Sequence, residues 1–188
     1  MLVSNNAIGP CTAIREAAYQ AYIYRNCDRL LSGRSLNARQ FHPDGFVTME
    51  TITLPLCKAR SMFTNVSEIA PEMYSIPRTA VNNPFDAICR PHWAFRVAIS
   101  RRTDLAVSLE SVRRVKAELG LDRGQPLYIV TICTPDVAAN AKWQPLLDSH
   151  NRRCAAGDST PDDAIIQYCI VVKWVPTCEV PKSMSQRS

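Results

Sequence analysis

Basic side chains that could bind phosphate are concentrated in one stretch of the sequence, between residues 90 and 116. Seven of them, against two acidic residues, account for the net charge of +5 of the whole 188-residue chain. Arginine dominates the group, and its planar guanidinium binds phosphate through paired hydrogen bonds. With one nearby histidine, the predicted nucleic-acid-binding residues are Arg90, His92, Arg96, Arg101, Arg102, Arg113, Arg114 and Lys116. The alternative is a solvated face whose acidic neighbours come from elsewhere in the fold.

Tyrosine and arginine alternate with apolar residues near the N-terminus, where residues 12–32 have the pattern of an amphipathic helix. These two residue types are enriched at binding hot spots, and they also suit contact with nucleic acid. We therefore predict an exposed interface made of Tyr19, Tyr22, Arg25 and Arg29. The alternative is that the tyrosine rings pack on their own domain.

Cysteine and histidine could in principle form a metal site or a catalytic pair. Cys89 and His92, like His150 and Cys154, have the spacing of zinc ligands, but nothing in the sequence brings the two pairs together. Asp148, Ser149 and His150 are contiguous, so their side chains would not face one another on a helix. None of the eight cysteines belongs to a C-x-x-C pair. We expect reduced cysteines, no metal, no cofactor and no catalytic residue.

One helix start could bind an anion. Thr134-Pro135-Asp136 follows a strongly apolar segment and has a hydroxyl N-cap, proline at the first position and an acid in the first turn. A helix N-terminus after a buried strand can hold phosphate, although the absence of glycine here favours an ordinary capped helix.

The elements that would position these residues alternate in type along the second half of the chain. Strands are predicted at 46–56, 92–100, 126–133 and 164–175 from their β-branched and apolar content. In the second of these, Trp93, Phe95, Val97 and Ile99 would face the core, with His92 and Arg96 on the opposite, exposed face. A helix over 109–119 should begin at Ser108 and end at Gly120, and a broken helical segment should run from Thr134 to Gly157. Residues 34–45 read as turns and residues 57–86 as irregular.

This order of elements predicts an α+β fold, a mixed β-sheet with packed helices and an N-terminal amphipathic helix. The alternative is a β-sandwich or jelly-roll with helical insertions. We divide the chain into an N-terminal arm and helix (1–45), a globular α+β body (46–176) and a C-terminal tail (177–188).

Composition favours an ordinary globular protein, with 46% hydrophobic and 21% charged residues. The N-terminal residues lack the pattern of a secretion signal, and no apolar run approaches the roughly 20 residues of a membrane span. We therefore expect an intracellular, cytoplasmic or virion protein that does not contact membrane.

A basic-aromatic N-terminal helix on a body without a convincing active site resembles small viral coat or nucleocapsid proteins in general build. We predict a non-enzymatic nucleic-acid-binding or assembly protein, a homo-oligomer whose partner is nucleic acid, RNA in particular. One alternative is a small intracellular α/β enzyme acting on an anionic, phosphate-bearing substrate near Thr134. Another is a protein-interaction effector that uses residues 57–86.

Overall fold

The computed structural model describes residues 10–79, 84–99, 107–122, 124–150, 152–154 and 164–173. The helices are α1 (Pro10–Arg25), α2 (Cys27–Leu30), the 3-10 helix η1 (Val66–Glu68), α3 (Leu109–Leu119) and α4 (Pro135–Ala138). The strands are β1 (Ser35–Phe41), β2 (Val47–Thr53), β3 (Ala59–Phe63), β4 (Met73–Pro77), β5 (Ala87–Cys89), β6 (Trp93–Ala98), β7 (Val107–Ser108), β8 (Leu127–Cys133), β9 (Leu146–Leu147) and β10 (Ile165–Val171).

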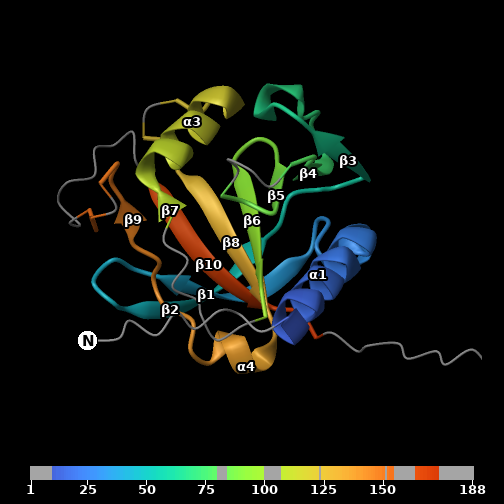
Figure 1. Cartoon of the computed structure of the whole chain (residues 1–188), viewed down its shortest axis with the longest axis horizontal. Helices are drawn as coiled ribbons and strands as arrows, with labels where there is room; N and C mark the ends of the chain where they lie inside the picture. The colour runs from blue at the N-terminus through green and yellow to red at the C-terminus, as the bar shows by residue number, and fades with distance from the viewer. Residues whose placement is uncertain are drawn as a thin grey trace, which may run out of the picture.

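Eight of the described strands form one mixed sheet in the order β2-β1-β10-β8-β6-β5-β4-β3 (Figure 1). Its centre is parallel, with β8 between β10 and β6, and antiparallel pairs flank this centre on both sides. The two short strands β7 and β9 pair separately. The predicted α+β fold with a mixed sheet is confirmed, and the described strands do not form the two packed sheets of the sandwich alternative.

The two longest described helices cover opposite faces of this sheet. On β6, Phe95 and Val97 belong to the hydrophobic core that contains α1, whereas Ala94 belongs to the core that contains α3. Successive side chains of a strand point to opposite faces, so these memberships place the two helices on either side. The alternation predicted for β6 is confirmed on the face that α1 covers, since Trp93 and Ile99 pack against the same core as Phe95 and Val97.

Local capping explains why α3 begins and ends where the sequence predicted. The Ser108 hydroxyl accepts a hydrogen bond from the Ser111 backbone N–H at 3.3 Å, which satisfies one of the unpaired donors of the first turn. Gly120 closes the helix with a φ of 73°, a left-handed conformation that costs glycine little.

Several elements differ from the sequence prediction. Residues 34–45 contain β1, which pairs with both β2 and β10, and residues 57–86 contain β3, η1 and β4. In the described part of the segment expected to be helical from Thr134 to Gly157, the helix is α4, and β9 follows it. The predicted domain boundary at residue 45 falls in the β1–β2 hairpin, and α1 packs on the main sheet. No helix of the described residues is long and apolar enough to cross a membrane.

Candidate nucleic-acid interface

The basic segment 90–116 does not form one exposed patch. Arg96 and Lys116 are buried, with exposed fractions of 8% and 5%, so their predicted exposure is wrong. Arg101 and Arg102 lie outside the described residues. Arg113 and Arg114 are exposed on α3 as predicted. The basic residues that lie close together in the sequence are therefore divided between the interior and the surface of the folded protein.

Arg96 is buried because both faces of β6 are covered. It donates a hydrogen bond to the side-chain oxygen of Gln144, and Gln144 in turn exchanges two hydrogen bonds with Gln167 of β10. Thr131 stands directly across from Arg96 on β8. These side chains form a buried polar layer between two apolar clusters on the same face of the sheet. Buried charge is tolerated where it is hydrogen-bonded in this way.

Three other residues of this segment that were predicted to bind nucleic acid contact groups of the protein itself. The Lys116 ammonium donates to the Ala164 carbonyl at 3.4 Å, because its position on α3 lies beside the buried stripe rather than opposite it. Arg90 is half-buried and reaches the carbonyls of Ser67 and Glu118. His92 is half-buried against Tyr128, with ring centres 4.7 Å apart, and burial lowers its pKa.

The N-terminal helical segment exposes Arg25 and Arg29 as predicted and buries Tyr19, whose predicted exposure is wrong, while the interface itself stays a prediction. Tyr19 is fully buried, and its hydroxyl donates to the Val172 carbonyl at 2.9 Å, because this side of α1 faces the sheet. Tyr22 is half-buried and stacks on Tyr19 with ring centres 6.5 Å apart. Arg25 and Arg29 are exposed.

Arg25 and Arg29 belong to a larger group that the sequence analysis missed. An Arg60 guanidinium nitrogen donates to the Arg25 carbonyl at 3.0 Å, and an Arg34 nitrogen donates to the Arg29 carbonyl at 3.0 Å. All four side chains are exposed, and none forms an ion pair with a described residue. We call these four residues the arginine surface. Residues far apart in sequence meet here, so no local charge count could reveal the group.

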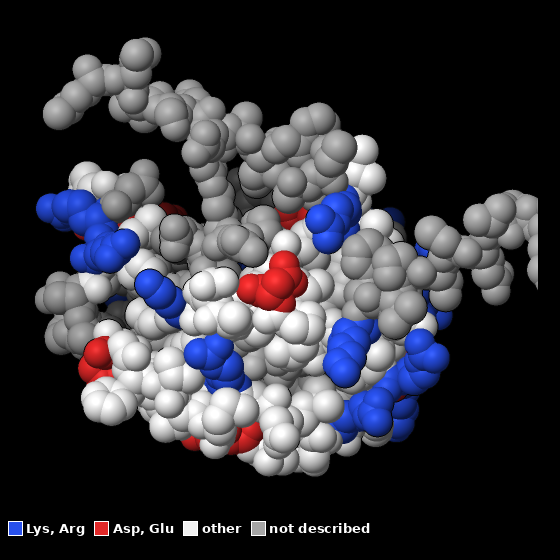
Figure 2. All heavy atoms as spheres, turned by 90° about the horizontal axis from the view of Figure 1, so that it is seen from below, with Lys and Arg blue, Asp and Glu red and all other residues white. Residues whose placement is uncertain are grey.

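Aromatic rings accompany the arginine surface. The Arg60 guanidinium lies over the Tyr24 ring, 5.8 Å from its centre, which is the geometry of a cation–π contact. Asp28 is the one acid within α2, the helix that also carries Arg29. Figure 2 shows that basic side chains also gather towards opposite edges of the face seen from below, with an acidic group between them.

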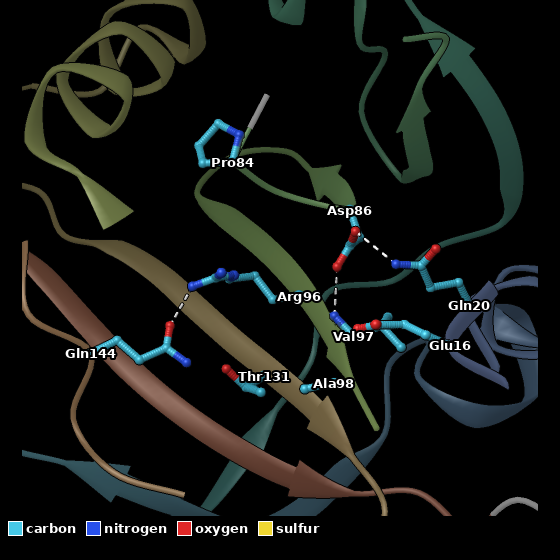
Figure 3. Close-up of a pocket in the computed structure, with 9 residues that line it drawn as sticks. All are labelled: Glu16, Gln20, Pro84, Asp86, Arg96, Val97, Ala98, Thr131 and Gln144. Atoms are coloured by element: carbon cyan, nitrogen blue, oxygen red, sulfur yellow. Dashed lines mark hydrogen bonds between the residues drawn. The ribbon is translucent and has the colours of Figure 1, made fainter. Parts of the chain in front are cut away.

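A polar cavity lies beside α1, where β5 ends and the edge of β6 becomes free (Figure 3). Asp86 precedes β5, and its carboxylate accepts the Val97 N–H at 2.7 Å, a donor that the shorter neighbouring strand does not reach. The Gln20 side-chain amide donates to the other carboxylate oxygen at 3.0 Å. Glu16 and Arg96 also line this cavity, so α1 and β6 both contribute charged groups to it.

Burial governs the protonation of both carboxyl groups. Burial raises the pKa of Asp86, while the Val97 N–H and the Arg96 charge lower it in part. Burial also raises the pKa of Glu16, and the nearby charge of Asp86 adds to this effect. Both groups therefore bind protons more readily in the folded protein than in the unfolded chain.

Replacing Asp86 by asparagine should change how stability depends on pH. Because the folded pKa is raised, the folded state binds more protons than the unfolded state above about pH 4. Wild-type stability relative to Asp86→Asn should therefore fall as pH rises through the raised pKa. Urea unfolding of both proteins at pH values from about 4 upwards measures this difference. If the wild type instead becomes more stable relative to Asp86→Asn as pH rises, the pKa of Asp86 is not raised in the folded protein.

The described cysteines and histidines form no recognisable centre. Cys57 and Cys89 have sulfurs 3.3 Å apart, and Cys133 and Cys169 have sulfurs 3.1 Å apart, yet the described cysteines are free thiols. Across the described ranges no group of three or more His, Cys, Asp and Glu side chains could hold a metal ion. The absence of zinc stays a prediction.

Comparisons with known proteins add no relative. No family model matches the chain, and neither a curated protein nor a solved structure matches it.

Proposed function

We propose that this protein is a non-enzymatic nucleic-acid-binding protein that contacts phosphates of a single strand, RNA in particular, through the arginine surface. The observation that carries the proposal is the group of four exposed guanidinium groups without an acidic partner among the described residues. Guanidinium groups bind phosphate oxygens in pairs, and this contact is independent of base sequence.

A single strand fits this surface better than a duplex. Tyr24 lies half-buried under the Arg60 guanidinium, and aromatic rings bind bases by stacking only where the bases are unpaired. Stacking tolerates every base because each has a π-face. We therefore expect little sequence preference.

The enzyme alternative has less support from the geometry. The helix after Thr134 is four residues long, and the Thr134 hydroxyl donates to Asp136 rather than projecting towards an open anion site. The effector alternative rested on an irregular segment, but this segment contributes β3 and β4 to the main sheet.

Fluorescence anisotropy with labelled oligouridylate and its deoxy counterpart tests the proposal on the full chain. We expect saturable binding near physiological salt, with Kd in the range of about 10⁻⁴ to 10⁻⁶ M that is typical of non-specific contact. Tighter binding of the ribose strand identifies RNA as the partner, and equal binding extends the partner to single-stranded DNA. No binding of either strand at low salt refutes the proposal.

A further inference from the structure

The polar cavity adjoins a larger one beneath α1. The two cavities have volumes of about 110 and 370 Å³, and Gln20, Asp86 and Val97 line both of them. Asp86 therefore stands at their junction. We call the two adjoining cavities together the α1 cleft. Its larger part falls within the size range of small-molecule sites, roughly 300–1,000 Å³.

The polar end of the α1 cleft offers hydrogen-bond acceptors. Each carboxylate oxygen of Asp86 accepts one hydrogen bond from the protein, from Val97 or from Gln20. A carboxylate oxygen has two lone-pair directions, so each retains capacity for a donor from a ligand. The Glu16 carboxylate, drawn beside Val97 in Figure 3, accepts no hydrogen bond from the described residues.

The charges around this end favour a cation. Glu16 from α1 and Asp86 from the segment before β5 are opposed by Arg96 of β6, which is already bonded to Gln144. Tyr74 of β4 also lies close to Asp86, and burial raises its pKa well above the ordinary value, so its hydroxyl stays neutral. With both carboxyls ionised, these groups carry one excess negative charge. A cation placed between the carboxylates would compensate the cost of their burial.

The opposite end of the α1 cleft is apolar and aromatic. Ala17 and Ala21 present small side chains on α1 and leave room above the sheet. The rings and apolar side chains around this space are Tyr24, Tyr74, Ile76, Pro77 and Phe85. An apolar body would be desolvated here, and a cation at the boundary would lie close to aromatic rings that attract positive charge.

We propose that the α1 cleft binds a small primary amine with an aromatic or aliphatic body. Its ammonium lies between Glu16 and Asp86, where three donors meet carboxylate oxygens, and its body lies against Tyr24 and Phe85. The charged end of this site, Glu16 and Asp86, is distinct from the arginine surface, whereas Tyr24 lies beside both.

Calorimetric titration of the full chain with phenethylamine tests the proposal. The neutral 2-phenylethanol and the anionic 3-phenylpropionate have the same ring and differ in the charge of the polar end. We expect the amine to bind at least about tenfold more tightly than the alcohol, with no binding of the acid. Equal affinity for amine and alcohol, or no amine binding, overturns the proposal.

Variants locate the site. Glu16→Gln and Asp86→Asn should each weaken phenethylamine at least about tenfold, while Glu110→Gln, on the exposed side of α3, leaves its affinity unchanged. Amine affinity should fall as pH is lowered, because protonation removes the carboxylate charges. Asp86 also supports β6, so if its variant does not fold, Glu16→Gln decides alone. Unchanged affinity in Glu16→Gln overturns the proposal.

Discussion

Replacing Phe95 by alanine is expected to lower the free energy of unfolding by about 3–5 kcal/mol, the usual cost of removing a buried ring. Phe95 is fully buried on β6, near the middle of the sheet, and its ring centre lies 5.3 Å from that of Tyr74. The sheet on one side and α1 on the other hold its neighbours in place. The structure can therefore collapse little around the cavity, and the lost contacts are not replaced.

Denaturant unfolding of Phe95→Ala beside Phe46→Ala measures this effect. Phe46 is 72% exposed, so its removal deletes the same atoms without creating a cavity, and its effect should stay within about 0.5 kcal/mol. Equal destabilisation by the two substitutions would show that the core does not centre on β6.

Replacing Arg25, Arg29, Arg34 and Arg60 by glutamine should weaken binding of oligouridylate about 10²–10³-fold at roughly 0.1 M salt. This estimate assumes that each guanidinium contacts one phosphate and releases its share of bound counterions. Glutamine keeps much of the side-chain stem, so packing over Tyr24 is disturbed less than by alanine.

A control variant with the same net charge separates local contact from general attraction. It replaces four exposed basic residues elsewhere by glutamine, namely Arg113, Arg114, Lys142 and Arg153. Long-range attraction depends on total charge, whereas phosphate contacts depend on position. The control should retain most of the affinity. Equal losses in both variants would show that binding is diffuse, and a larger loss in the control would move the interface to α3 and the α4–β9 region.

Elements with strong local signals were predictable from the sequence. The bounds of α3 follow from Ser108 and Gly120, because a cap acts within one turn and needs no tertiary information. β6 and β8 were identified because apolar periodicity reports burial directly. β1 was missed because its polar residues, such as Arg39 and Gln40, conceal a strand whose place in the sheet is fixed by β2 and β10.

The candidate site was much less predictable. Alternation placed Arg96 opposite Phe95 correctly, but it could not show that a polar layer containing Gln144 and Gln167 covers that second face. On α1, the amphipathic pattern of the sequence could not decide whether Tyr19 or Arg25 faces the sheet. Arg25 and Arg60 come together because α1 ends beside β3, and the sequence alone does not show that these two elements are neighbours.

The salt dependence of oligouridylate binding tests the central claim most directly. The logarithm of the association constant should fall linearly with the logarithm of salt concentration, with a slope of about −0.7 per phosphate contact for a single strand. The glutamine variant of the arginine surface should have a slope shallower by about 2.8, corresponding to four lost contacts, while the control variant keeps the wild-type slope. Wild-type slopes in both variants would show that the arginine surface does not contact phosphate.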